Sequence, residues 1–193
     1  MSPKNQAKGE KMKSSQNYFS KALLTFSILS SSLFLSPISK ANLEFQWDPD
    51  PNFVRLKSFQ TSSEVNDRST YYLFLRPRER KTGILKLSIK IPDYFGAKIK
   101  PEKLSFCHVK IGGFTEKTRC IKTIPAIYEI NENQTQIDIF PDQPIPSDKK
   151  SYAFVMKIRN PRLPHMYQFH AYAQAPGSVP ISGYMGTWSL DVD

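Results

Sequence analysis

The sequence predicts an all-β fold, an antiparallel immunoglobulin-like β-sandwich of about eight short strands. From residue 42 onward, apolar and polar residues alternate with the period of two that is typical of strands, and helical periodicity is nearly absent. Most prolines fall between the alternating runs, where they end strands instead of interrupting them. Short runs of this kind, separated by turn residues, are typical of a sandwich.

The alternation defines the expected strands in order along the chain. In the run 84–91, Leu87 and Ile89 share one face opposite Ser88 and Lys90. One polar face per strand predicts antiparallel sheets with one side in water. The expected strands are 70–75, 84–91, 106–111, 119–124, 127–130, 136–140, 151–159, 167–175 and 187–192.

Two prolines carry more specific expectations. Pro101 opens the segment 101–104 and predicts one helical turn, because proline suits the first position of a helix. Pro125 separates two short runs and therefore predicts an edge or a bend.

Residues 1–41 predict a secretory signal peptide. A lysine-rich start is followed by a 14-residue apolar run, 22–35, and then by Ser39 and Ala41, two small residues that suit a cleavage site after Ala41. The run is shorter than the ~20 apolar residues of a membrane-spanning helix, so cleavage is favoured over an uncleaved anchor. Met12 is an alternative start, because it gives a signal of more ordinary length.

Without this leader the chain is only moderately basic. The full sequence has 27 Lys and Arg against 17 Asp and Glu, a net charge of +10, and the leader removes six lysines and one acid. The remaining residues, 42–193, are expected to form a single sandwich domain with a net charge of +5. We expect no nucleic-acid partner, and no membrane contact beyond the signal segment. An anionic envelope polymer or another envelope protein is the expected partner, and a merely solvated basic surface is the alternative.

The two cysteines, Cys107 and Cys120, predict a disulfide. An even count is typical of exported proteins, and the turn signal Gly112-Gly113 would bring two neighbouring strands together. A zinc site is the alternative, but the spacing does not suit one and no second pair of thiols exists.

The densest run of basic residues, 76–81, lies between two expected strands. Its basic cluster consists of Arg76, Arg78, Arg80 and Lys81. Presented on a hairpin tip, these cations would bind phosphate or carboxylate groups, for which guanidinium forks are suited. The alternative is a solvated loop whose charges keep sheet edges from aggregating.

His165, Met166 and His170 form the best candidate for a metal site. Imidazole nitrogen and thioether sulfur suit copper, so a periplasmic copper-binding protein is the alternative function. The competing interpretation is that both histidines are ordinary surface residues. The sequence has no Gly-x-Ser-x-Gly elbow and no phosphate-binding loop, so neither catalysis nor a cofactor is expected, although dispersed acids leave a hydrolase open.

Aromatic residues are frequent between 53 and 74, among them Phe59, Tyr71, Tyr72 and Phe74. Core packing is their expected role, because aromatics dominate sandwich interiors. Carbohydrate stacking on an exposed sheet face is the alternative.

The C-terminal half carries an ordered set of short motifs. They are the segments 140–146, 160–161, 166–169, 175–177 and 183–186. Together with Phe45-x-Trp47-Asp48 and the Arg76-Pro77-Arg78 segment, this order resembles the cyanobacterial exported family known as domain of unknown function 2808, over roughly residues 44–193.

The resemblance implies an exported, envelope-associated domain without enzymatic activity. It transfers no catalytic or binding residue, because the family has none defined. We therefore expect a non-catalytic protein of the periplasm or outer cell envelope that binds an anionic polymer or another envelope protein.

Overall fold

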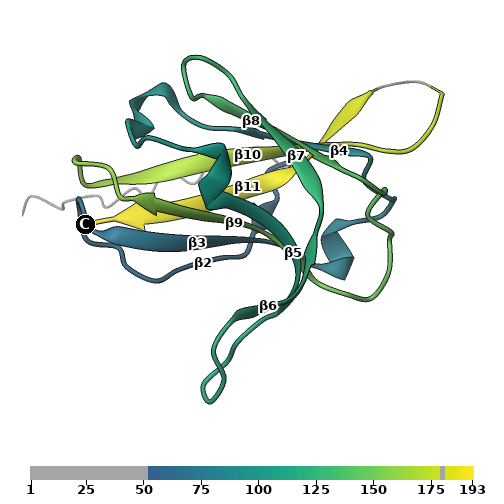
Figure 1. Cartoon of the computed structure of the whole chain (residues 1–193), viewed down its shortest axis with the longest axis horizontal. Coiled ribbons are helices and arrows are strands. Elements are labelled where there is room, and N and C mark those ends of the chain that lie inside the picture. Colours follow the sequence, from purple (N-terminus) through teal and green to yellow (C-terminus); the bar gives the residue numbers. More distant parts are fainter. Residues whose placement is uncertain (1–51, 179–180) are drawn as a thin grey trace, which may run out of the picture. The chain divides into compact units, whose positions relative to one another are not determined.

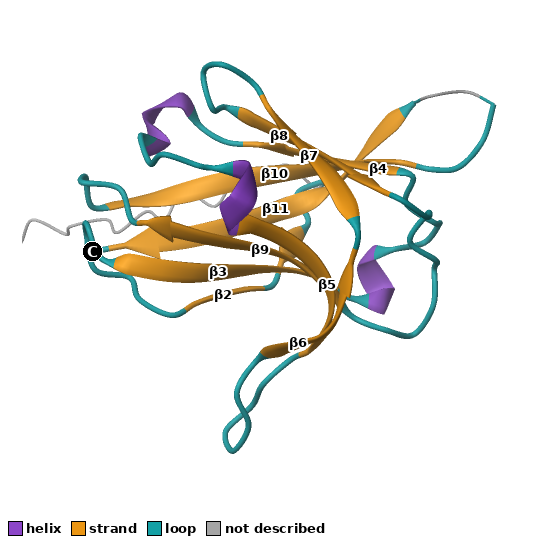
Figure 2. Cartoon of the chain, in the orientation of Figure 1, coloured by secondary structure: helices purple, strands orange, loops and turns teal. Residues whose placement is uncertain are grey.

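Strand pairing in the computed structural model, which describes residues 52–178 and 181–193, produces two sheets (Figure 1). The first contains, from edge to edge, β1 (Arg55–Leu56), β11 (Ser182–Val192), β10 (His165–Gln174), β4 (Lys86–Lys90), β8 (Gln136–Pro141) and β7 (Ala126–Ile130). The second contains β2 (Ser58–Gln60), β3 (Arg68–Leu75), β9 (Tyr152–Arg159), β5 (Leu104–Lys110) and β6 (Arg119–Ile124). The helices of the described chain are three 3-10 turns, η1 (Pro77–Glu79), η2 (Asp93–Phe95) and η3 (Pro101–Lys103) (Figure 2). The predicted immunoglobulin-like sandwich is confirmed.

The core lies between the two sheets, because strands of both turn one apolar face inward. Leu73 and Phe154 of the second sheet and Phe169 and Trp188 of the first are fully buried in it. The indole Nε1–H of Trp188 donates to the carbonyl oxygen of Phe74 over 3.1 Å, which joins the two sheets by a hydrogen bond as well as by packing.

The sheets differ from the expectation in strand number and in one pairing. The described chain has eleven strands instead of about eight, because β1 and β2 are too short for alternation to show in the sequence. β1 also pairs with β11 in parallel, with Arg55 opposite Thr187, so the first sheet is not wholly antiparallel. Each predicted run does contain a strand, with its ends shifted by a few residues.

Both proline expectations are confirmed. Pro101 begins η3, a single 3-10 turn. Pro125 lies between β6 and β7, which are edge strands of different sheets, so the chain passes from one sheet to the other at this residue.

A second apolar cluster lies on the outer face of the second sheet. Its buried members are Phe74, Cys107, Val109, Ala153 and Val155. Tyr72 packs against this cluster, whereas Tyr71, on the opposite face of β3, belongs to the core between the sheets. The predicted core packing of the aromatics is therefore correct for Tyr71 and for Phe74, which is fully buried in the second cluster, whereas Tyr72 is only partly buried against that cluster. Phe59 is 46% exposed.

The predicted signal peptide, residues 1–41, and the motif around Trp47 lie outside the described residues. Among residues 52–178 and 181–193, no helix has the length and hydropathy needed to cross a membrane.

Candidate functional site

The basic cluster lies on a crossover between the sheets, because β3 belongs to the second sheet and β4 to the first. The predicted hairpin tip is therefore wrong. Pro77 opens η1, and Glu79 folds back on Arg76, accepting from its backbone N–H over 2.7 Å and from its Nε over 2.8 Å. Arg78 adds a longer contact, Nε to Glu79 Oε1 at 3.5 Å. One buried carboxylate thus positions two guanidinium groups.

Arg80 points away from this surface and has a structural role. The residue is 3% exposed, and its guanidinium donates to the carbonyl oxygens of Pro146, Asp148 and Lys150 and to the Asp148 carboxylate at 3.2 Å. It also lies 4.5 Å from the centroid of the Tyr152 ring. The prediction that Arg80 binds a ligand is wrong, because a guanidinium with these partners has no accessible face.

The partners of Arg80 form one network around Asp148. Burial alone would raise the pKa of Asp148, but hydrogen bonds from the Lys150 N–H, the Tyr152 hydroxyl and Arg80 hold that pKa below its usual range. Burial raises the pKa of Tyr152, and the neighbouring Asp148 carboxylate raises it further. Asp148 therefore stays ionised and pairs with the buried cation.

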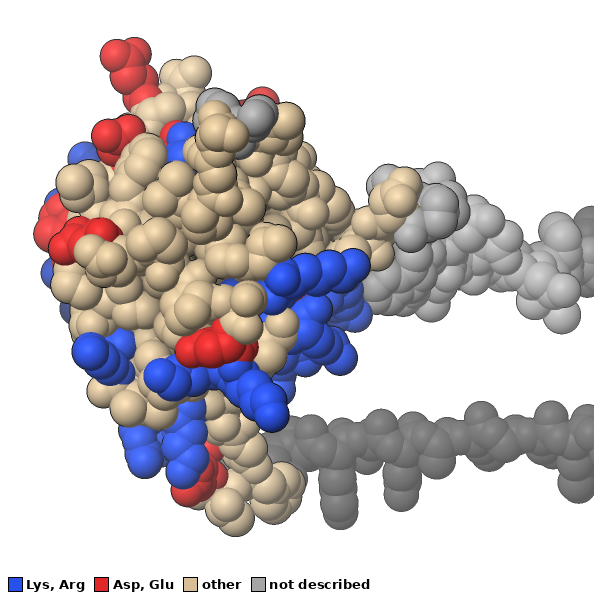
Figure 3. All heavy atoms as spheres, turned by 90° about the vertical axis from the view of Figure 1, so that its right-hand side faces the viewer, with Lys and Arg blue, Asp and Glu red and all other residues tan. Residues whose placement is uncertain are grey.

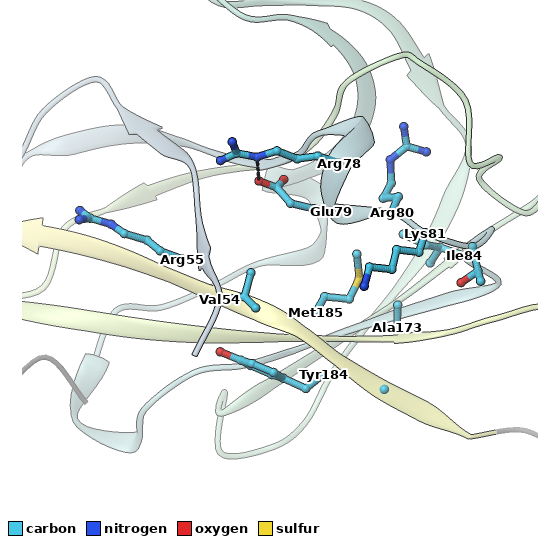
Figure 4. Close-up of a pocket in the computed structure, with 12 residues that line it drawn as sticks. Val54, Arg55, Arg78, Glu79, Arg80, Lys81, Ile84, Ala173, Tyr184 and Met185 are labelled. Carbon is cyan, nitrogen blue, oxygen red and sulfur yellow. Dashed lines mark ion pairs between the residues drawn. The ribbon is translucent and has the colours of Figure 1, made fainter. Parts of the chain in front are cut away.

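Two of the remaining cations, Arg78 and Lys81, border a pocket of about 490 Å³ together with Glu79 (Figure 4). Arg78 and Lys81 come from the crossover, and Arg55 comes from β1. The apolar part of the lining includes Val54, Ile84, Ala173 and Met185. Figure 4 shows Lys81 extending toward Met185, while Arg80 points the other way.

Arg55 was missed by the sequence analysis, because its place depends on the parallel pairing of β1 with β11. Gly186 makes this pairing possible. Its φ is +147°, and a Cβ there would lie 2.6 Å from the carbonyl oxygen of Val54. Only glycine fits such an approach without displacing β1.

A second depression of about 390 Å³ adjoins this pocket and shares Arg55 and Arg78 with it. Lys57 and Arg76 also line it. In Figure 3, lysine and arginine side chains gather over the lower part of the face drawn, with an acidic group among them and another at its lower edge, and the other acidic side chains lie along the left and upper margins. We call the two depressions together the basic groove.

The three residues proposed for copper do not form one site. Along β10, Tyr167, Phe169 and Ala171 point to the core, so His165 projects from the same face of the strand and His170 from the opposite one. Five residues of extended strand separate their Cα atoms by about 16 Å. The predicted ligand set is therefore wrong as a single metal site.

Each histidine also has another environment. His165 packs edge-on against Tyr94, with ring centroids 5.0 Å apart. His170 Nδ1 lies 2.8 Å from the hydroxyl of Thr187, which also contacts Tyr184 at 2.6 Å, and burial lowers the pKa of His170. Thr187 is fully buried, so this network gives no substrate access to its hydroxyl.

Cys107 and Cys120 are joined in a disulfide, as the sequence predicted. The bond links Cys107 in the middle of β5 to Cys120 near the loop end of β6, where Val109 is the residue opposite Cys120. Within the described residues, no group of three His, Cys, Asp or Glu side chains could hold a metal ion.

Comparisons with solved structures return distant β-sandwiches. A collagen-binding domain of a Staphylococcus aureus adhesin is 11% identical, with a TM-score of 0.41 over 72% of this chain and 97% of that one. The bacterial hydrophobin BslA is 12% identical, with a TM-score of 0.45 over 72% and 91%. A protein from Nocardia farcinica with an immunoglobulin-like fold is 10% identical, with a TM-score of 0.39 over 72% and 97%.

No curated protein matches the chain. A family model does, over residues 45–192, which is most of the chain and nearly all of the described part. The chain therefore belongs to the family described as "Protein of unknown function (DUF2808)".

Proposed function

We propose that the protein is an exported, non-catalytic component of the periplasm or outer cell envelope that binds an anionic polymer in the basic groove. The observation that carries the proposal is the arrangement of five cations, Arg55, Lys57, Arg76, Arg78 and Lys81, around two adjoining depressions. A linear polymer with several phosphates or carboxylates can contact the cations of both depressions at once, which a single small anion cannot do.

The chemistry of the groove suits such a ligand. Arg78 is 71% exposed and contacts Glu79 through Nε, so its two terminal nitrogens face outward for a bidentate contact. Lys81 forms no ion pair with any described residue, and it supplies a point charge beside the apolar surface of Met185. The apolar lining would contact the backbone of the polymer while the cations bind its charged groups.

Export is supported by the predicted signal peptide and by the disulfide, since disulfides persist in oxidising compartments. Intact-mass analysis of the protein from fractionated cells tests this part. A chain that begins at Asn42 in the periplasm or medium is the expected result. A membrane-bound chain that retains residues 22–35 would contradict it.

Polymer binding is tested with two soluble probes, polyphosphate and polygalacturonate, and with neutral dextran as a reference. We expect R78E/K81E to lose at least about tenfold in affinity for one of the polyanions, because a hydrogen bond to a charged group contributes roughly 1.5–3 kcal/mol. The matched control is K98E/R162E, which changes net charge equally at two exposed residues outside the groove.

The control separates a site from general charge attraction. Equal losses in R78E/K81E and K98E/R162E would mean that net charge alone attracts the polymer, and the proposal would fail. It would also fail if the wild type bound neither polyanion, or if R78E/K81E bound as tightly as the wild type. In either of those cases, capture of an acidic envelope protein would be the next partner to test.

A further inference from the structure

The β5–β6 hairpin extends away from the sandwich and carries the most exposed large apolar side chain of the described chain (Figure 1). Phe114, at its tip, is 110% exposed relative to a reference residue. Ile121, the extra residue where the β5–β6 register shifts, is 57% exposed. Single exposed apolar residues are common on protein surfaces, so the inference depends on what surrounds them.

The tip has a defined shape that holds Phe114 outward. Gly113 N–H donates to the carbonyl oxygen of Glu116 over 3.0 Å, and Gly112 N–H donates to Thr118 Oγ1 over 3.0 Å. The two arms of the loop approach so closely that a Cβ on Gly112 would lie 2.4 Å from the Glu116 oxygen. With the Cys107–Cys120 disulfide joining the two strands below the loop, these contacts present the phenyl ring on a braced projection.

The hairpin is strongly basic, and its cations repel one another across the strands. Between residues 110 and 122 there are four cations and one acid, Glu116, which pairs with Lys110 at 2.8 Å. The register sets Lys110 opposite Arg119. Like charges directly opposite each other destabilise a sheet, and an anionic surface would offset this cost.

The sequence alone predicted no membrane contact beyond the signal segment, but from the shape and charge of this hairpin we propose that it docks on the surface of an anionic lipid bilayer, with Phe114 inserted at the boundary between headgroups and acyl chains. Lys117, Arg119 and Lys122, none of which has a salt bridge to a described residue, would contact lipid phosphates. An aromatic ring at the apex of a basic projection matches the interface of a bilayer, which is apolar beneath and anionic above. A soluble polyanion offers no place for the ring.

The test uses the protein as its cells process it, with the N-terminus read by intact mass so that all variants are compared in the same form. Binding is measured by cosedimentation with vesicles of phosphatidylcholine alone and of phosphatidylcholine with phosphatidylglycerol. We expect binding only to the anionic vesicles. It should weaken as salt rises from about 0.1 M to about 1 M, because the Debye length falls from ~10 Å to ~3 Å.

Two variants separate the apolar and the charged contributions. F114S should reduce partitioning about tenfold, because the ring no longer enters the interface. K117E/K122E should reduce it by at least about 25-fold, since each cation at an anionic surface changes partitioning by about five-fold. L163S and K98E/K103E, which change exposed residues elsewhere, should bind within about two-fold of the wild type.

Insertion itself is read with F114W, compared with the wild type on the same vesicles, because Trp47 and Trp188 are present in both proteins and the difference in emission reports the residue at position 114. Its emission should shift to shorter wavelength on anionic vesicles and be quenched by brominated acyl chains. R78E/K81E should bind vesicles as the wild type does, which separates this proposal from the basic groove. The proposal is overturned if the wild type binds neither vesicle. It is also overturned if F114S and K117E/K122E bind normally, or if F114W binds without an emission shift.

Discussion

The basic groove and the β5–β6 hairpin are both rich in cations, but the fold holds those cations in different ways. In the groove, Glu79 positions Arg76 and Arg78, and the neighbouring Arg80 is buried against Asp148 and main-chain carbonyls. In the hairpin, one exposed ion pair accompanies three cations without salt bridges in the described chain. The difference shows that a run of basic residues does not reveal which cations a ligand can reach.

The comparison also separates two kinds of recognition. The groove is preorganised by buried partners, so it suits a ligand with charges at fixed positions. The hairpin presents exposed charge and one apolar ring on a braced projection, so it suits an extended surface. The predictions below are designed to alter one region and leave the other unchanged.

The largest expected effect is on Arg80. Replacing it in R80M removes the cation that Asp148 and three carbonyl oxygens bind, and loss of one partner from a buried pair costs about 3–5 kcal/mol. The free energy of unfolding, measured by urea denaturation, should fall by this amount. R78M, which changes a 71% exposed arginine on the same crossover, should lose less than about 1 kcal/mol. A similar loss in both variants would contradict the structural role of Arg80.

The next effect concerns the disulfide. The cysteines are 13 residues apart, and closing a loop of this size contributes about 3 kcal/mol in the chain-entropy model. The double variant C107A/C120A should therefore unfold at lower temperature and bind anionic vesicles more weakly. Its affinity for polyanions should match that of the wild type, because the groove is built from other strands. If the variant lost polyanion binding and kept vesicle binding, the assignment of polyanions to the groove and of lipid to the hairpin would be contradicted.

A smaller effect is expected for G186A. The added Cβ would meet the carbonyl oxygen of Val54 and the side chain of Leu56, and forced repacking of this kind costs about 1–3 kcal/mol. Because β1 also carries Arg55, polyanion affinity should fall together with stability. Vesicle binding is the internal reference. If G186A kept full polyanion affinity, the parallel pairing of β1 would not be needed to form the groove.

The smallest effect concerns acid pH. Hydrogen bonds hold the pKa of Asp148 below its usual range despite burial, and a hydrogen bond from Lys110 lowers the pKa of Glu116. A carboxyl group whose pKa is lower in the folded protein than in the unfolded chain, where it is ~3.9 for Asp, stabilises the fold at pH values above the unfolded pKa. This stabilisation is lost as the pH falls through the folded pKa. Melting temperatures below about pH 4 should therefore depend less steeply on pH in D148N than in the wild type. E116Q should follow the wild type, since Glu116 is exposed and solvent screens its ion pair.

The sequence predicted the strands well and the candidate site only in part. Period-two alternation reports which residues face the core, so the long strands could be predicted, and Pro125 predicted an edge or a bend but not the crossover between sheets. The roles of Arg55 and Arg80 could not be predicted. The position of Arg55 depends on the two-residue parallel pairing of β1, and the burial of Arg80 depends on Asp148, which is distant in sequence. His165 and His170 were grouped by proximity in sequence, although residues five apart on a strand face opposite ways.

The central claim is that an anionic polymer binds in the basic groove and not elsewhere on this basic protein. Backbone amide shifts in a two-dimensional NMR titration with the polyanion that binds more tightly test it most directly. We predict that the largest shifts occur at Arg55, Arg78, Lys81 and Met185, while amides of β7 and β8 stay unchanged. Shifts spread evenly over all exposed lysines and arginines, or concentrated in the β5–β6 hairpin, would contradict the claim.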